Sequence, residues 1–203
     1  MRSRTHPSLE GRCKVCFLPE VLCICREFAP YPNQAEVVIV RHALERFKTS
    51  NTARWTPIAL TRCRVFEHGG PSDPPLVEEA FRGAWLIFPG VEPSLPSGPL
   101  PSRLVAIDGS WSQARHMVHR LAVLRSLPRL SLAAPAPGIP RLRVQRLPAE
   151  MSTLEAIAHA LAALGETEAA ERVAAVHRLA VQRVSSLRRR SAMGGPGLRR
   201  NPS

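Results

Sequence analysis

An acidic residue stands where an apolar run ends and a helix pattern begins, near the middle of this 203-residue chain. Residues 105–107 predict a buried parallel strand, and Asp-Gly-Ser-Trp follows it at 108–111. Ser110 is a good helix N-cap, and Gln113 completes a capping box. Asp108 is therefore expected at the carboxyl end of a strand, where open α/β sheets bind ligands. A carboxylate exposed there can act as a general base or orient a substrate hydrogen; alternatively, it only shapes the turn.

Four cysteines near the N-terminus have the spacing of a metal site. They form a Cys-x2-Cys-x6-Cys-x-Cys pattern at Cys13, Cys16, Cys23 and Cys25. Thiolates hold Zn²⁺ at about 2.3 Å in a tetrahedron, and two close pairs can wrap one ion. Because cysteine fills every ligand position and leaves none for water, the predicted zinc is structural rather than catalytic. The alternatives are four reduced, buried thiols or an adventitious disulfide. Cys63, in another segment, is expected to be a core thiol.

Polar side chains follow two further strands. After the strand expected at 37–40, the segment 41–52 contains Arg41, His42, Glu45, Lys48, Ser50, Asn51 and Thr52. This segment could line a pocket floor, contact phosphates or supply His42 as a base, or it could be a solvated helix with an ordinary Glu–Lys pair. After the strand at 85–88, Pro89 and Gly90 form a turn whose exposed amides could hold a ligand, or an ordinary turn.

The order of elements predicts an α/β fold with a mostly parallel sheet and flanking helices. Besides those above, strands are expected at 64–66 and 103–107, with further candidates at 130–132 and 142–144. Helices are expected from 111 to about 125, from a second capping box at Ser152 and Glu155 to 164, and over 168–187. The expected organisation is a lead and four-cysteine knuckle at 1–30, an α/β catalytic domain at 31–188, and a basic disordered tail at 189–203.

The charge of the chain favours a polyanionic partner. The formal net charge is +12, and only five of these charges come from arginines in the last stretch, so the body is basic in its own right. The helix from 111 carries a basic side that is either suited to phosphates or merely solvated. No apolar run reaches the roughly 18 residues of a membrane span, and the first residues lack a signal peptide, so a cytoplasmic protein without a membrane partner is expected.

Taken in order, these blocks resemble the DTW-domain family, which is named for an Asp-Thr-Trp signature. The resemblance covers about residues 11–165: the cysteine cluster, the Glu…Ser-Asn-Thr block, the Leu-Ile-Phe-Pro strand end, the Asp-Gly-Ser-Trp turn and the Ser-Thr-Leu-Glu-Ala helix start. Ser110 replaces the usual threonine and keeps the hydroxyl. The resemblance implies a SPOUT-like, knotted α/β enzyme. It also implies a tRNA-uridine aminocarboxypropyltransferase, which moves the 3-amino-3-carboxypropyl group of S-adenosylmethionine to N3 of a tRNA uridine.

The resemblance also implies roles for particular residues. Asp108 is the catalytic candidate, as the base or as the group that orients the uracil imide or the donor amine, and its turn is expected to expose it to ligand. Residues expected to bind S-adenosylmethionine are Phe88, Pro89, Gly90, Ser110, Trp111, Ser152, Thr153 and Glu155. Residues expected to contact tRNA are Arg41, Arg54, Arg115, Arg120 and Arg143. Two rival functions remain, an RNA methyltransferase using the same donor and a non-catalytic zinc-knuckle RNA-binding protein.

Overall fold

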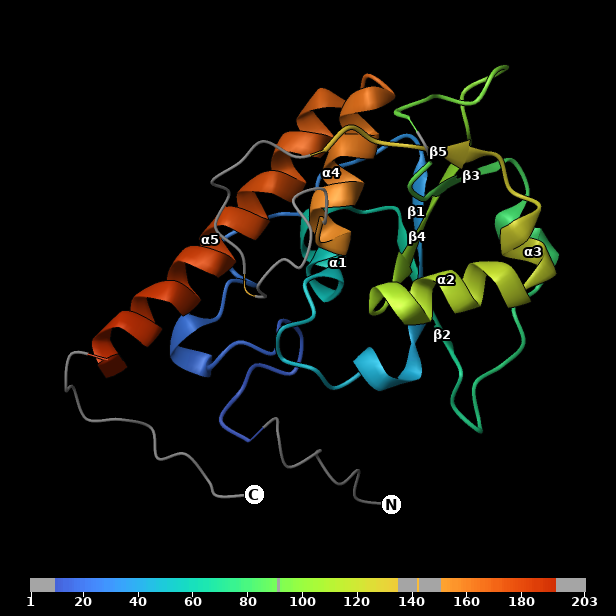
Figure 1. The fold of residues 1–203 in the computed structure, drawn as a ribbon. Helices are drawn as coiled ribbons and strands as arrows, with labels where there is room; N and C mark the ends of the chain where they lie inside the picture. The colour runs from blue at the N-terminus through green and yellow to red at the C-terminus, as the bar shows by residue number, and fades with distance from the viewer. Residues whose placement is uncertain (1–9, 91, 135–141, 143–150, 193–203) are drawn as a thin grey trace.

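A five-stranded sheet with all neighbouring strands parallel forms the centre of the molecule (Figure 1). The computed structural model describes residues 10–90, 92–134, 142 and 151–192. In spatial order the strands are β2, β1, β4, β3 and β5. Their bounds are β1 Glu36–His42, β2 Cys63–His68, β3 Ala84–Ile87, β4 Arg103–Asp108 and β5 Arg129–Leu130. The sheet therefore confirms the predicted α/β class.

β1 and β4, which pair with each other inside the sheet, are buried on both faces, as their unbroken apolar sequences predict. Alternate side chains of β1 enter different cores because successive residues of a strand point to opposite faces. Val37 and Ile39 pack with residues of α4 and α5, whereas Val38 and Val40 pack with residues of α2 and of a short 3-10 helix, η5. The strand is thus the shared wall of two hydrophobic cores.

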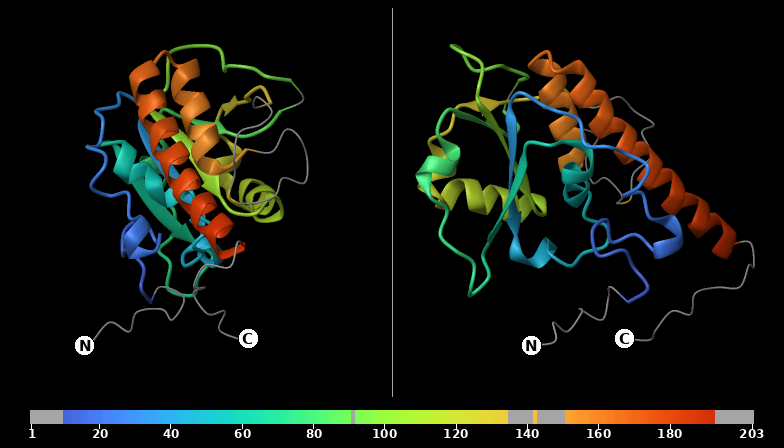
Figure 2. Two further views of the ribbon diagram at one scale, coloured as in Figure 1. Left: turned by 90° about the vertical axis from the view of Figure 1, so that its left-hand side faces the viewer. Right: turned by 180° about the vertical axis from the view of Figure 1, so that it is seen from behind.

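Helices cover both faces of the sheet and give a three-layer sandwich (Figures 1 and 2). One face carries η5 Glu78–Phe81, α2 Trp111–Arg120 and α3 Ala122–Arg125. The other face carries η4 Ala53–Trp55, α1 Thr56–Ala59, α4 Thr153–Ala163 and α5 Thr167–Ala192. Two further 3-10 helices, η2 Glu20–Leu22 and η3 Ala43–Glu45, lie in the N-terminal part of the chain. Among the described residues, no helix combines the length and apolarity needed to cross a membrane.

The N-terminal knuckle packs against the α5 face rather than standing apart. Cys16, Leu18 and Ile24 are fully buried and belong to the same core as β1 and α5. The Trp55 indole Nε1 donates a 2.9 Å hydrogen bond to the Cys16 carbonyl, and Arg183 of α5 forms a 2.6 Å ion pair with Glu27. The knuckle is therefore braced by two elements that come much later in the chain.

Both predicted capping boxes are present and fix where α2 and α4 begin. Ser110 and Gln113 exchange backbone-to-side-chain hydrogen bonds of 3.3 and 2.7 Å. Ser152 and Glu155 do the same at 3.3 and 2.8 Å. These side chains satisfy amides that have no partner within the first helical turn. The N-termini of both helices are thereby set at the carboxyl edge of the sheet.

Two boundaries differ from expectation. The helix expected from 111 to about 125 is two helices, because Leu121 adopts an extended conformation between α2 and α3. The last helix continues to Ala192, so it includes residues 189–192 that were expected in a disordered tail. The rest of that tail, and residues 143–144 of the expected strand at 142–144, lie outside the described residues. The knot stays a prediction.

Candidate active site

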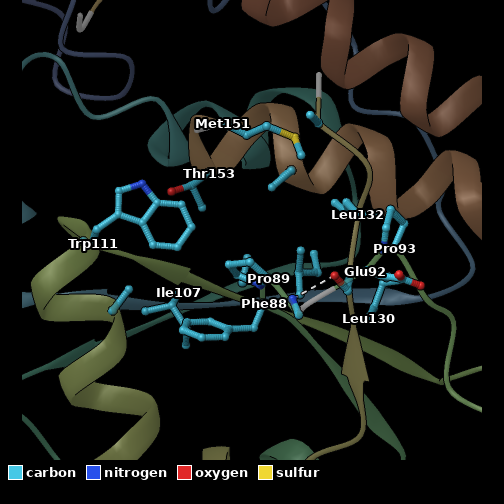
Figure 3. A pocket seen from close by; sticks show the side chains of 18 residues that line it. Phe88, Pro89, Glu92, Pro93, Ile107, Trp111, Leu130, Leu132, Met151 and Thr153 are labelled. Carbon is cyan, nitrogen blue, oxygen red and sulfur yellow. Dashed lines mark hydrogen bonds between the residues drawn. The ribbon is translucent and has the colours of Figure 1, made fainter. Parts of the chain in front are cut away.

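A cavity of about 310 Å³ opens at the carboxyl ends of β3, β4 and β5, between the N-termini of α2 and α4 (Figure 3). Its walls are mostly apolar. Phe88 and Trp111 form one wall, with ring centroids 6.5 Å apart in an edge-on arrangement, and Met151 faces them. This is the place in an open parallel sheet where ligands are expected, and the volume lies at the small end of the usual range for ligand pockets.

The structure brings together five of the eight residues expected to bind S-adenosylmethionine. Those that line the cavity are Phe88, Pro89, Gly90, Trp111 and Thr153. The other three, Ser110, Ser152 and Glu155, are not among the lining residues and form the two capping boxes instead. Their observed contacts therefore fix where α2 and α4, the two helices that frame the cavity, begin.

The turn after β3 does not offer the free amides that its sequence suggested. Pro89 has no N–H, and the Gly90 N–H already donates to the Ser131 hydroxyl at 2.8 Å. A side chain at position 90 would lie 3.2 Å from that hydroxyl oxygen, so glycine permits this close contact. The turn is thus anchored to the segment after β5, and it shapes the wall of the cavity.

Sequence reasoning missed several residues that line the cavity. Glu92 is the one charged side chain among the described lining residues, and Ser131, Leu132 and Met151 complete the far wall. All four lie outside the helices and strands named above. Ser131 and Leu132 were predicted only as part of a candidate strand at 130–132, and no motif marked them as cavity residues.

Asp108 is buried, which corrects the expectation that its turn exposes it. Its residue is 5% exposed, and it is not among the residues that line the cavity. The pleat explains this, because Ile107 points to the α2 face and the next side chain points to the α4 face. There Asn51 Nδ2 donates to Oδ2 at 2.5 Å, and Thr153 Oγ1 donates to Oδ1 at 3.3 Å.

Thr153 connects the buried acid to the cavity, because it both lines the cavity and donates to Asp108. Burial raises the pKa of Asp108 above its ordinary value, and the nearby charge of Glu45 adds to this. The hydrogen bonds from Asn51 and Thr153 and the charge of Arg41 act in the opposite direction. The site therefore holds a carboxylate with raised proton affinity, one hydroxyl away from the cavity.

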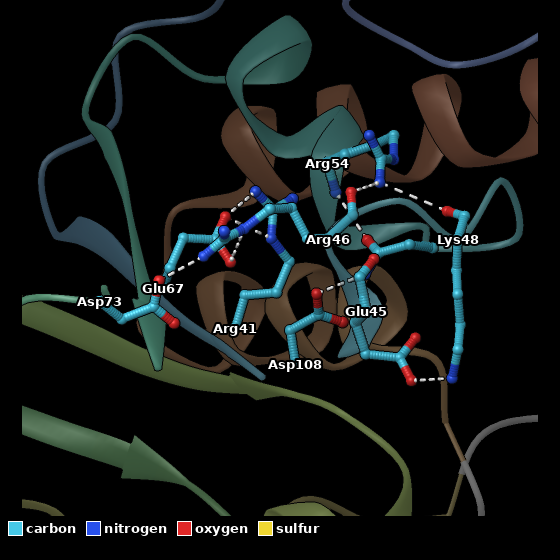
Figure 4. A network of polar contacts seen from close by, with 9 residues as sticks. Arg41, Glu45, Arg46, Lys48, Arg54, Glu67, Asp73 and Asp108 are labelled. Atoms are coloured by element: carbon cyan, nitrogen blue, oxygen red, sulfur yellow. Dashed lines mark hydrogen bonds and ion pairs between the residues drawn. The ribbon is translucent and has the colours of Figure 1, made fainter. Parts of the chain in front are cut away.

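Arg41 and Arg54, both expected to contact tRNA, instead have internal partners (Figure 4). Arg41 forms an ion pair with Glu67, which stands beside it on β2. Arg54 is 7% exposed, donates to the carbonyls of Arg46 and Lys48 at 2.8 and 3.3 Å, and covers a phenyl ring, that of Phe17, at 3.5 Å. Burial lowers the pKa of Arg54 to about 10. Because neither side chain offers an open face, this structure does not support a phosphate contact for them.

The segment after β1 is not a solvated helix. Glu45 is 1% exposed and pairs with Lys48 at 2.5 Å, and Asn51 is 2% exposed. His42 Nδ1 accepts a 3.2 Å hydrogen bond from the Leu44 amide, and burial lowers its pKa. This segment therefore helps to hold Asp108 in place, through the hydrogen bond that Asn51 donates to it.

The remaining arginines expected at an RNA surface have different positions. Arg115 and Arg120 are exposed on α2. Arg143 lies outside the described residues. The basic side of α2 therefore remains open to a partner, unlike the β1–β2 edge.

The four cysteines come together as predicted. Their sulfur atoms all lie within 4.8 Å of one another, with Cys13–Cys25 and Cys16–Cys23 separations of 3.7 and 3.8 Å. A tetrahedron with 2.3 Å metal–sulfur bonds has edges of about 3.8 Å, and these two separations match it, so the cluster could hold a metal ion. Cys63 lies elsewhere, half-buried against the core, and burial raises its pKa to about 12.

Fold and site together define an α/β protein with a ligand cavity at the carboxyl edge of a parallel sheet. The chain belongs to the DTW-domain family, whose model matches residues 10–185.

Curated relatives carry an enzyme name. The chain is 29% identical over 176 residues to the Drosophila melanogaster protein named tRNA-uridine aminocarboxypropyltransferase 2, covering 80% of this chain and 70% of the fly protein. Proteins of the same name from Macaca fascicularis and Mus musculus are 26% and 27% identical. The matches cover 75% and 78% of this chain, which spans only 56% and 58% of those relatives. No solved structure matches the chain significantly.

Proposed function

We propose that this chain is a tRNA-uridine aminocarboxypropyltransferase that uses S-adenosylmethionine as donor and N3 of a tRNA uridine as acceptor. One observation carries the proposal: a buried carboxylate, Asp108, is joined through the Thr153 hydroxyl to an apolar cavity at the family's signature turn. The names of the relatives support the same reaction class and tRNA as the substrate. Such a substrate and reduced cysteines fit a cytoplasmic enzyme.

The cavity suits the donor in size and polarity. Phe88 and Trp111 offer aromatic surface for an adenine ring, and Glu92 offers a carboxylate for ribose hydroxyls or for a positive charge. No cationic side chain is among the described residues of the wall, so a sulfonium would meet no repulsion there. The mixture of apolar surface with few polar groups is typical of a small-molecule site.

When bound, S-adenosylmethionine supplies a carbon made electrophilic by its sulfonium, and methylthioadenosine leaves as the uridine nitrogen displaces it. Selection of one carbon among three depends on positioning, which can contribute about 7–11 kcal/mol to lowering a barrier. Trp111 and Phe88 would hold the donor while α4 presents Thr153 from the opposite side of the cavity. The protein thereby determines which bond breaks.

The imide proton needs an acceptor as the new C–N bond forms. Thr153 Oγ1 takes the proton from uridine N3 while its own proton passes to Asp108 Oδ1, so the carboxylate ends as a neutral acid. Burial raises the pKa of Asp108 and so makes it the stronger base for this step. Asn51 donates to Oδ2 and keeps Oδ1 turned toward Thr153. Asp108 thus acts through a hydroxyl rather than directly.

The cysteine cluster would hold a structural Zn²⁺ in this enzyme. All four ligand positions are filled by cysteine, so the ion would cross-link the knuckle without activating water. The knuckle also packs against Trp55, next to the segment that carries Asn51. Its expected contribution is to stability and to the shape of that segment.

Product analysis tests the proposal and separates it from both rivals. The chain is incubated with unmodified tRNA and S-adenosylmethionine, and nucleosides and small products are identified by mass spectrometry. The proposal expects aminocarboxypropyluridine together with methylthioadenosine. Methylated nucleoside with S-adenosylhomocysteine would instead identify a methyltransferase, and absence of donor binding in calorimetry would leave an RNA-binding protein; either result overturns the proposal.

A further inference from the structure

A second hollow, of about 130 Å³, lies on the other side of Phe88 from the cavity. It is formed by α2, α3 and β5, which adjoin one another on one side of the molecule (Figure 1). Besides Phe88, its lining residues are Arg115, Val118, His119, Arg125 and Arg129. Three arginines and a histidine therefore line one small hollow.

No carboxylate lines this hollow, and its arginines form no ion pair with any described residue. The contrast with the β1–β2 edge is sharp, because Arg41, Arg46 and Arg64 each have a carboxylate partner there. Bringing like charges together without a counter-charge is unfavourable, so a bound anion would stabilise this arrangement.

Structural roles account for only part of the cluster. Arg125 donates to the carbonyl of His119 at 3.1 Å, which caps the last turn of α2. Arg129 lies over the Phe88 ring at 5.6 Å and helps to hold this wall. Arg115 stands in the middle of α2, away from the helix end, and no described side chain bonds to it. Its guanidinium is free to bind a ligand in the hollow.

We propose that this hollow binds a phosphate of the RNA backbone next to the uridine whose base enters the cavity; this rests on the proposed function. A nucleotide places its phosphate one sugar away from its base, and here Phe88 lines both the basic hollow and the cavity, so the two lie next to each other. Arginine suits phosphate because its planar fork can donate two parallel hydrogen bonds. The hollow would fix the register of the RNA without reading its sequence.

The test measures binding of unfractionated tRNA to the full chain, without donor, over a range of salt concentrations. Arg115→Gln is expected to weaken binding about tenfold and to reduce the slope of log Kd against log salt by about 0.9. Arg115→Lys keeps the charge and should retain most of that slope. Arg178→Gln, which removes one exposed charge from α5 on the opposite face, is the matched control and should change Kd less than twofold.

Two further arms distinguish other anions. Arg115→Gln should leave the affinity for S-adenosylmethionine unchanged and should leave the melting temperature unchanged or higher, because it removes like-charge repulsion. The inference is overturned if Arg115→Gln and Arg178→Gln weaken tRNA binding equally. It is also overturned if inorganic phosphate raises the melting temperature of the wild type but not of Arg115→Gln, while both bind tRNA equally well. Loss of donor affinity alone in Arg115→Gln would overturn it as well. Because the test measures binding and not turnover, its result does not depend on whether the chain catalyses the proposed reaction.

Discussion

Replacing Thr153 by valine should separate the chemistry of the site from its shape. The substitution keeps the volume and the branching of the side chain but removes the hydroxyl that lies 3.3 Å from Asp108. In the proposed mechanism no other group on the cavity wall passes the imide proton to this carboxylate. Position 153 is the first residue of α4, and the cap is made by Ser152, so the helix should still begin correctly.

The size of the effect follows from the role of the hydroxyl. Positioned acid–base groups contribute about 10²–10⁴ in rate, so Thr153→Val should lower kcat by that factor. At 1.36 kcal/mol per tenfold change, the loss corresponds to about 2.7–5.4 kcal/mol of transition-state free energy. Thr153→Ser keeps a hydroxyl at this position and should stay within about tenfold of the wild type. Donor affinity should change little in either variant.

Single-turnover transfer, followed by methylthioadenosine release across a range of pH, provides the assay. In the wild type, the rate should rise with pH as Asp108, whose pKa is raised by burial, loses its proton. That rise should be lost in Thr153→Val, because Asp108 no longer receives the imide proton. If Thr153→Val keeps kcat within threefold and shows the same pH profile, the hydroxyl carries no proton and the relay is wrong.

Three further predictions concern stability. Asp108→Asn should abolish transfer yet raise the free energy of unfolding at neutral pH by about 0.5–2 kcal/mol. The folded-state pKa of Asp108 is raised, so its contribution to stability is full at low pH and is lost as pH rises through that pKa. The stability gained by Asp108→Asn, measured by urea titration, should therefore shrink as pH falls. A gain that does not change with pH would contradict this. Ser152→Ala removes the cap of α4 and should cost about 1 kcal/mol, with donor affinity by calorimetry unchanged if its role is structural. Cys13→Ser should lower the zinc content measured by atomic emission and destabilise the chain by at least about 2 kcal/mol, or about 4–8 °C in Tm; full zinc occupancy would refute the four-cysteine site.

The parts of the fold that depend on local sequence could be predicted. The apolar runs of β1 and β4 identify buried parallel strands, because no other short element needs to be apolar on both faces. The capping boxes at Ser110 and Ser152 fix two helix starts, since each consists of a hydroxyl and an amide or acid three residues apart. The cysteine spacing likewise brings four thiols together within one short segment.

The parts that depend on neighbouring strands could not be predicted. Arg41 is neutralised by Glu67 only because β1 and β2 are adjacent with this register, and the sequence carries no signal for strand order. Glu92 and Ser131 both line the cavity because they follow β3 and β5, and the sequence does not show that these two strands are neighbours. The burial of Asp108 could have been predicted. Successive side chains along β4 point to opposite faces of the sheet, so Asp108 points to the face opposite Ile107.

The cysteine knuckle has a consequence for when such an enzyme can work. Phe17, inside the knuckle, lies against Arg54, whose amide donates to Asn51 at 3.2 Å, and Asn51 in turn holds Asp108. Three contacts, one of them through the backbone amide of Arg54, thus link Phe17 of the knuckle to the acid that would accept the proton. If the proposed zinc is lost, or if oxidants join these thiols in disulfides, the knuckle would no longer support Asn51, so the proposed RNA modification would depend on the zinc supply and the redox state of the cell.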